Sequence, residues 1–225
     1  MFIQSLAISY ALFLFFNMII AIRANSAQKN ELLQKGFNST MIIHWVEPNE
    51  KLGANNADVF FDLLFDDNNI ASNEIIDKKP VFVHAVNCTC AEINQTNYIR
   101  FNAWNGFINR SITELACSDP STKKIATEIF NKLEWKFAWV NDDYGLVAAR
   151  IIAMIINEAY YALEENVSTK EQIDVAMKLG TNYPFGPFEW SQKIGLKHIA
   201  NLLKQLQKQN QQYSISELLM QESQL

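Results

Sequence analysis

The hydrophobic residues of this chain follow two different patterns, which change near residue 145. Between residues 18 and 140, short apolar runs rich in valine, isoleucine and aromatic residues alternate with polar or helix-forming stretches. Runs of this length and composition are typical of buried strands, and their alternation with helices predicts an α/β layered sheet. The expected strands are residues 18–22, 41–46, 57–65, 80–86, 98–104, 111–117 and 136–140.

Two helices are expected within this α/β part. One follows the first strand and ends at Gly36, a residue type that commonly stops helices. The other spans residues 120–133, because Asp119 occupies an N-cap position and Pro120 the first helical position. Both predictions rest on local signals at the helix ends.

After Gly145 the pattern becomes helical. Residues 146–166 are apolar nearly all round and predict a buried helix. Ser168 and Glu171 match a capping box that starts a second helix, and Gly180 is expected to end it. A third helix over residues 188–209, with a site for a kink at Gly195, and a short helix within residues 211–225 complete this part.

The pattern therefore divides the chain into an apolar N-terminal extension (1–17), an α/β domain (18–144) and a helical domain (145–225). The boundary between the two domains is expected near residues 141–145.

Within the helical part, the stretch "GTNYPFGPFEW" interrupts the helices with stiff and aromatic residues. Its prolines and glycines suit a fixed turn, and we interpret it as mainly architectural, with contact to a substrate as the alternative.

The first 22 residues carry no charge and are long enough to span a bilayer. Three interpretations stay open. Met18 begins a strand, turn and helix of the kind that opens a Rossmann-type domain, so that residues 1–17 are an upstream extension. Alternatively the segment is a membrane anchor, or a cleaved signal peptide, although a basic start and a clean cleavage site are absent. The first interpretation fits best with the α/β pattern of residues 18–140.

Composition narrows the classes of function. The chain has 24 acidic and 19 basic residues among 225, and it contains no basic stripe that would indicate nucleic-acid binding. Cys88, Cys90 and Cys117 do not form a disulfide framework, and the Cys88-x-Cys90 spacing lacks a second cysteine pair for zinc. We therefore expect reduced thiols, no bound metal and a cytoplasmic protein.

Residues 151–203, with "IDVAMKLGTNYPFGPFEW" followed by "IGL", closely resemble the C-terminal helical domain of the 3-hydroxyacyl-CoA dehydrogenases. The α/β part resembles the NAD-binding domain of that family more weakly. "ADVFFDLLFDD" stands at the family's acidic-ended strand, and "VFVHAVNCTC" is similar to "xFASNTSS". "YIRFNAWNGFINRSITELA" is similar to "HFFNPxxxMxLVEV", and "DDYGLVAARI" to "DxPGFIxNRL".

The resemblance implies a shortened, degenerate Rossmann-like domain followed by an all-α domain of the 6-phosphogluconate dehydrogenase C-terminal-like type. It also implies NAD-dependent oxidation of 3-hydroxyacyl-CoA to 3-oxoacyl-CoA in fatty-acid metabolism, and a homodimer formed through the C-terminal helices. The expected ligands are thus NAD and an acyl-CoA.

The cradle for the NAD pyrophosphate is normally G-x-G-x-x-G between the first strand and helix, where glycines let the backbone approach the phosphates. Residues 23–28 of this chain read "RANSAQ", and no G-x-G occurs anywhere in the sequence. Arg23 is a candidate for attracting phosphate and Ser26 for capping the helix. Side chains at Ala24, Ser26 and Ala27 would crowd a pyrophosphate.

The family's base is the histidine of "HFFNP", with a glutamate twelve residues later. Glu114 matches that glutamate, and Asn102, or Arg100 in a shifted alignment, stands at the histidine position. Asparagine does not titrate and arginine stays protonated, so neither can act as the base. Of the three histidines, His84 is the candidate for a relocated base, whereas His198 is expected to be exposed.

The remaining family positions are partly kept. Thr89 matches the serine that contacts the substrate, and Asn87 is retained. Ala149 stands where the family has an asparagine, so that donor is lost, while Arg150 beside it is present. The glycine cradle, the histidine and the asparagine are therefore missing together, and such groups act as a unit. The sequence predicts lost or much reduced catalysis, with a working dehydrogenase and a scaffold that binds acyl-CoA or a partner as alternatives.

Overall fold

The computed structural model describes residues 17–224. Residues 1–16, on which the extension, anchor and signal-peptide interpretations of the N-terminus depend, lie outside the described residues. Met18–Arg23 form the first strand, as the apolar pattern predicted. Within residues 17–224, no helix combines the length and the apolar character needed to cross a bilayer.

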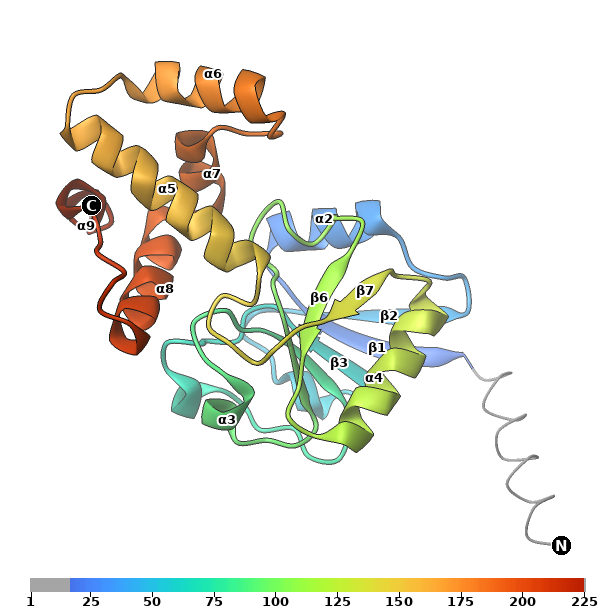
Figure 1. Cartoon of the computed structure of the whole chain (residues 1–225). Helices are drawn as coiled ribbons and strands as arrows, with labels where there is room; N and C mark the ends of the chain where they lie inside the picture. The colour runs from blue at the N-terminus through green and yellow to red at the C-terminus, as the bar shows by residue number, and fades with distance from the viewer. Residues whose placement is uncertain (1–16, 225) are drawn as a thin grey trace, which may run out of the picture.

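Within the described residues, seven strands form one sheet in the order β2-β1-β3-β4-β5-β6-β7 (Figure 1). Every strand expected from the apolar runs is present, and most are shorter than the run that predicted them. The strands are β1 (Met18–Arg23), β2 (Met41–Val46), β3 (Val59–Asp62), β4 (Val81–His84), β5 (Tyr98–Phe101), β6 (Thr113–Ala116) and β7 (Phe137–Trp139).

The sheet is parallel except between β5 and β6. Strand β1 lies between β2 and β3, so the chain adds β2 on one side and then returns to add β3 on the other. This reversal is the topological switch point of a Rossmann-like sheet, where a crevice forms beyond the carboxyl ends of the strands. The ends of β1 and β3 therefore locate the first place to look for a ligand site.

Helices and loops cover the two faces of the sheet differently. Helices α2 (Ser26–Lys35) and α4 (Pro120–Leu133) pack on the same face, where Leu32 and Phe130 join the largest aromatic cluster of the sheet. The opposite face is covered by loops, the short helix α3 (Cys90–Ile93) and the 3-10 turns Leu52–Ala54 and Ile70–Ser72. The connections from β2 to β3 and from β3 to β4 contain 3-10 turns in place of crossover helices, and this is the sense in which the domain is shortened.

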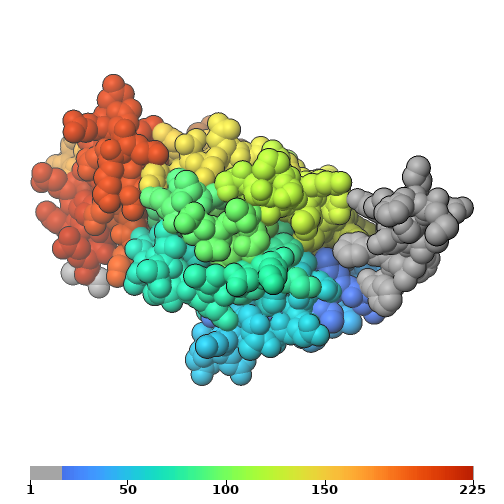
Figure 2. Space-filling view, turned by 90° about the horizontal axis from the view of Figure 1, so that it is seen from below, coloured from blue at the N-terminus to red at the C-terminus, as the bar shows by residue number. Residues whose placement is uncertain are grey.

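Five helices form the C-terminal part of the described chain, and they lie beside the sheet (Figure 1). In Figure 2 the orange and red segments make up one end of the molecule. These helices share one apolar cluster, which Trp104 and Phe107 join from the sheet side. The helices are α5 (Ala148–Glu164), α6 (Lys170–Thr181), α7 (Pro187–Ile194), α8 (Leu196–Gln209) and α9 (Glu217–Glu222).

Two expected helix ends were wrong in detail, whereas the expected kink at Gly195 is present. Thr169, not Ser168, caps α6, because its hydroxyl accepts the Gln172 N–H. Gly180 does not stop this helix, which continues to Thr181 and ends at Asn182 in the left-handed region. The third predicted helix is divided into α7 and α8 at Gly195, whose φ of 96° allows the chain to change direction.

The turn between α6 and α7 depends on one buried carboxylate. Asp174 accepts the N–H groups of Phe188 and Glu189 at 2.8 and 3.1 Å, which otherwise lack partners at the start of α7. A Cβ atom on Gly186 would lie only 2.2 Å from Asp174 Oδ1. The glycine is therefore required by this close approach, and its own φ of −73° is ordinary.

Candidate functional site

A cavity of about 380 Å³ lies at the switch point, where a Rossmann-like sheet would hold a dinucleotide. The turn after β1, the loop after β3, the end of β4 and the loop after β5 form its walls, and α7 and α8 close it from the helical side. Its lining residues are Asn25, Gln28, Leu63, Leu64, Phe65, Asp66, Asp67, Asn68, His84, Ala103, Trp104, Asn105, Ile194 and His198.

The buried side chain of Gln28 occupies the centre of the turn that would cradle a pyrophosphate. Its amide Nε2 donates to the carbonyls of Leu63 and Ala103 at 3.0 and 3.2 Å, which links α2 to the ends of two strands. Its Oε1 accepts the N–H of Asn25, and Asn25 Oδ1 accepts the N–H of Gln28. The capping box therefore occupies N–H groups that could otherwise donate hydrogen bonds to a bound phosphate.

Asn25 caps α2, so the expectation that Ser26 caps it was wrong; Ser26 is the exposed first residue of the helix. The Arg23 guanidinium donates to both carboxylate oxygens of Asp62, at 2.6 and 3.1 Å, and to the carbonyl of Glu50. Burial lowers the pKa of Arg23, but the hydrogen bonds and charge of Asp62 outweigh it and raise the pKa overall. The charge that was a candidate for holding phosphate is thus paired within the protein.

These residues do not fit a dinucleotide bound as in a Rossmann cradle. When residues 23–28 are set against G-x-G-x-x-G, Arg23, Asn25 and Gln28 stand at the glycine positions, and the Gln28 side chain is buried in the turn. At the helix start the capping box occupies the N–H groups of Asn25 and Gln28.

His84 lies at the carboxyl end of β4 and lines the same cavity. Its Nδ1 accepts the N–H of Ala103 at 3.0 Å, so the proton of the neutral ring resides on Nε2. Burial lowers the pKa of His84 to about 4. The charge of Asp67 acts to raise this pKa, and the nearby His198 acts to lower it. At neutral pH this imidazole therefore presents a hydrogen-bond donor to the cavity, whereas a general base needs a free acceptor nitrogen.

The two family positions face each other across β5 and β6, because the antiparallel register pairs Phe101 with Leu115 and thus sets Asn102 opposite Glu114, but they form no dyad. Asn102 is buried, its Oδ1 accepts the N–H of Trp104, and its Nδ2 has no partner in the described part of the chain. Glu114 on β6 instead accepts the N–H groups of Val147 and Ala148 at 3.0 Å each. The glutamate thus caps the start of α5 and has no titrating side chain to orient.

Arg100, the alternative at the histidine position, is completely buried on β5. It pairs with Asp142 and donates to the carbonyls of Ala85 and Asp143. Asp142 in turn accepts the N–H of Cys90, so this group ties the segment before α5 to the sheet. Burial acts to raise the pKa of Asp142, but the Cys90 N–H and the charge of Arg100 lower it overall.

The other family positions have local structural partners. Thr89 caps α3, in a capping box with Glu92. Asn87 donates its backbone and side-chain N–H groups to Asp67, which receives a further bond from the Val86 N–H. Ala149 is fully buried in the apolar cluster of the helices. Arg150 donates to the hydroxyl of Tyr213 at 2.6 Å.

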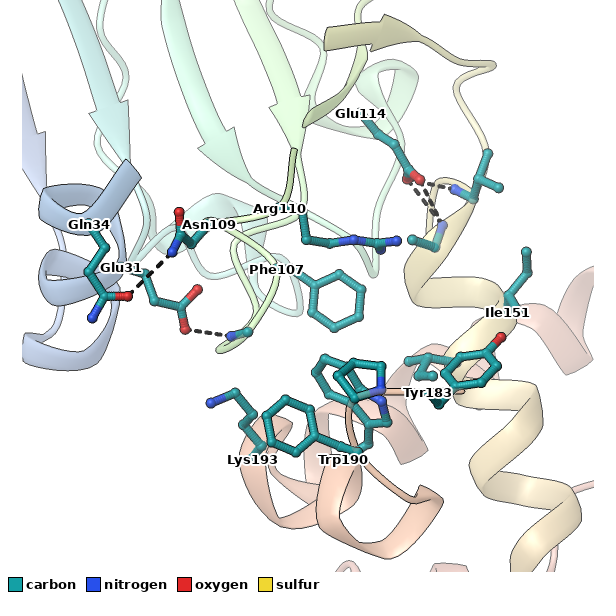
Figure 3. A pocket seen from close by; sticks show the side chains of 16 residues that line it. Glu31, Gln34, Phe107, Asn109, Arg110, Glu114, Ile151, Tyr183, Trp190 and Lys193 are labelled. Carbon is teal, nitrogen blue, oxygen red and sulfur yellow. Dashed lines mark hydrogen bonds between the residues drawn. The ribbon is translucent and has the colours of Figure 1, made fainter. Parts of the chain in front are cut away.

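A second cavity, of about 550 Å³, lies between α2, α5 and α7 (Figure 3). Glu114 forms part of its wall, and most of the remaining wall is aromatic or aliphatic. Its lining residues are Glu31, Gln34, Gly106, Phe107, Asn109, Arg110, Glu114, Val147, Ala148, Ile151, Ile152, Tyr183, Pro184, Phe185, Trp190 and Lys193.

The described residues hold no group of three histidine, cysteine, aspartate or glutamate side chains arranged to bind a metal ion. Cys88 and Cys90 are buried free thiols, and burial raises the pKa of Cys90 to about 12. Both side chains therefore stay protonated at neutral pH and pack as small apolar groups.

Comparison with known proteins supports the resemblance of the helical part. Residues 145–223, about a third of the chain, match the model of the 3-hydroxyacyl-CoA dehydrogenase C-terminal domain. Helices α5, α7 and α8, which line the two cavities from one side, lie within the matched residues.

Two relatives illustrate the extent of the match. The chain is 48% identical to the 3-hydroxyadipyl-CoA dehydrogenase of Escherichia coli K12 over 66 residues, which are 29% of this chain and 14% of that enzyme. It is 37% identical to the 3-hydroxybutyryl-CoA dehydrogenase of Bradyrhizobium diazoefficiens over 89 residues, 40% of this chain and 30% of that enzyme. The chain thus aligns with less than a third of the length of these two family members.

The likeness of folds extends further than the likeness of sequences. The structure of (S)-3-hydroxybutyryl-CoA dehydrogenase from Ralstonia eutropha superposes with a TM-score of 0.71 at 15% identity, covering 91% of this chain and 92% of that one. This comparison supports the Rossmann-like sheet followed by a helical part. The sheet shares the dehydrogenase fold, whereas the sequence match is concentrated in the helical domain.

Sequence reasoning missed the two residues that organise the switch point. Gln28 was overlooked because only glycines were sought in the turn, although Asn25-x-x-Gln28 matches the readable pattern of a capping box. Asp67 lies in the stretch that resembles a family motif, but its role in holding the loop after β4 comes from contacts across 19 and 20 residues. No local sequence pattern predicts contacts between residues so far apart in the chain.

Proposed function

We propose that this chain is a 3-hydroxyacyl-CoA dehydrogenase-family protein that does not transfer hydride to NAD and that serves as a binding scaffold. The observation that carries the proposal is the Gln28 side chain, which joins α2 to the carbonyls of Leu63 and Ala103 within the dinucleotide position. A pyrophosphate could enter only if this amide lost both acceptors, and each broken buried hydrogen bond would cost about 1–3 kcal/mol.

The positions of the reacting groups support the same proposal. Asn102 cannot accept a proton, Glu114 caps α5, and the free nitrogen of His84 carries a proton at neutral pH. Absence of a general base alone lowers a rate by about 10²–10⁴-fold. Since base and cofactor cradle are affected together, the expected residual activity is negligible.

The ligand and assembly of this scaffold are inferred from the family. The relatives are named for CoA thioesters, so we propose that an acyl-CoA of fatty-acid metabolism is the ligand retained. We also propose a cytoplasmic homodimer formed through the C-terminal helices, without metal or nucleic acid. The exposed Val175 and Leu179 on α6 provide apolar area for such an interface.

Titration calorimetry with NAD and NADH, and NADH formation from 3-hydroxybutyryl-CoA, test the proposal. We expect no binding at micromolar cofactor and no turnover, while the 3-hydroxybutyryl-CoA dehydrogenase of Bradyrhizobium diazoefficiens under the same conditions serves as the positive control. Micromolar NAD binding by the unaltered chain would contradict the proposal. Activity that disappears in His84→Ala would favour the alternative, a working dehydrogenase with a relocated base.

A further inference from the structure

The cavity between α2, α5 and α7 is separate from the switch point, and its wall includes four aromatic residues, Phe107, Tyr183, Phe185 and Trp190. Phe107 and Trp190 lie with ring centroids 5.2 Å apart, and Trp190 contacts Phe185 at 4.9 Å with nearly perpendicular planes. In Figure 3 the Phe107 and Trp190 side chains lie close together, and Tyr183 lies to one side of them, next to α5. A flat aromatic ligand would gain edge and face contacts with several of these rings at once.

Arg110 supplies a cation at the edge of this space. Its guanidinium lies over the Phe107 ring, 5.2 Å from the centroid, and in Figure 3 its side chain extends toward α5. Arg110 makes no ion pair with any residue of the range 17–224. A planar guanidinium stacked on a ring is preorganised to receive a carboxylate through two parallel hydrogen bonds.

The two carboxylates in the wall are already engaged. Glu31 accepts the N–H groups of Gly106 and Ile108, which fastens the loop after β5 to α2. Glu114 accepts N–H groups at the start of α5, where the helix dipole further offsets its charge. These carboxylates are therefore partly compensated, whereas the positive charge of Arg110 is not.

We propose that this cavity binds an aromatic carboxylate, with its ring against Tyr183 and the contacting pair Phe107 and Trp190, and its carboxylate on Arg110. A volume of about 550 Å³ suits a ligand of one or two rings. The exposed Val147 and Ile151 extend the apolar wall at the open side. This inference goes beyond the proposed function, because it concerns neither the switch point nor the dinucleotide.

Titration calorimetry and amide chemical-shift mapping by NMR test the site with naphthoate, with uncharged naphthyl methanol and with octanoate. We expect naphthoate to bind more tightly than either analogue and to shift the amides of Gly106, Phe107 and Trp190. Arg110→Ala should weaken naphthoate binding about tenfold and leave naphthyl methanol unaffected. Arg110→Lys, which keeps the charge without the planar fork, should recover only part of the loss.

Lys197→Gln is the matched control, because Lys197 is an exposed cation on α8 outside this cavity. An equal loss of naphthoate affinity in the Arg110→Ala and Lys197→Gln variants would show that only the net charge of the protein matters, and it would overturn the inference. Equal binding of naphthoate and naphthyl methanol would remove the role of Arg110. Shifts confined to other surfaces, or a second copy of the chain covering the cavity in solution, would likewise contradict it. Failure of NAD to bind leaves the expected naphthoate result unchanged, so the two proposals are tested independently.

Discussion

Replacing Gly186 with alanine tests why the turn between α6 and α7 has its sequence. The backbone of Gly186 has φ and ψ values of −73° and 168°, which alanine adopts freely. The added Cβ, however, would lie 2.2 Å from Asp174 Oδ1 and 2.4 Å from its Cβ and Cγ. Real Cβ contacts are not this short, so the buried Asp174 side chain must withdraw.

Withdrawal of Asp174 breaks its bonds to the N–H groups of Phe188 and Glu189. Hydrogen bonds to a charged group contribute about 1.5–3 kcal/mol each, and relaxation recovers part of the loss. We therefore expect Gly186→Ala to lower the free energy of unfolding by about 3 kcal/mol. For a chain of this size the melting temperature should fall by about 6–12 °C.

Urea unfolding of a double-mutant cycle separates this clash from other causes. Asp174→Ala removes the same two bonds, so adding Gly186→Ala should then cost little, with a coupling of about 2 kcal/mol between the two sites. Gly180→Ala is the matched control, because a Cβ there meets no atom within 4 Å and the position lies inside α6. It should stabilise the protein by about 1 kcal/mol. A Gly186→Ala variant as stable as the parent, or strictly additive with Asp174→Ala, would refute the reasoning.

Three further predictions concern charged and titrating groups. Because the pKa of His84 is lowered in the folded protein, the unfolded chain binds this proton more readily, and the free energy of unfolding should fall as the pH drops from 6.5 to about 4. Urea unfolding of His84→Gln at several pH values should show a smaller pH dependence over this range. An unchanged pH dependence would contradict the assignment to His84. Arg100→Ala should cost about 3–5 kcal/mol in urea unfolding, because it leaves Asp142 without its cation, and a cost near that of an exposed arginine would contradict the ion pair. Glu114→Ala should lower stability by about 1–2 kcal/mol in a thermal melt through loss of the α5 cap, and no change would show that the cap is unimportant.

The local signals along the chain account for much of the fold. The α4 helix spans Pro120–Leu133 as predicted, because Asp119 and Pro120 specify its start through bonds within the first turn. The strands were found because each is a short β-branched or aromatic run. The errors at Ser168 and Gly180 arose where nearby residues, Thr169 and Asn182, can fill the same capping roles.

The candidate site was harder to predict, because its residues depend on contacts between distant segments. The absence of the family's glycines, histidine and asparagine could be read directly from the sequence, because it depends only on which residue type stands at each position. The Gln28 side chain is held in the turn after β1 by the carbonyls of Leu63 and Ala103, which lie 35 and 75 residues away in the sequence. The aromatic cavity likewise needs Phe107 from the sheet side and Trp190 from α7.

The sequence by itself determined the α/β-then-α order, the family resemblance of the helical part and the absence of a glycine cradle, because periodicity, capping and residue type are local properties. Only the tertiary structure decided that Glu114 caps α5, that His84 accepts a backbone N–H, and that Arg110 stands over an aromatic cavity. These outcomes depend on which donors and acceptors meet when the sheet packs against the helices. A linear pattern specifies each group but not its partner.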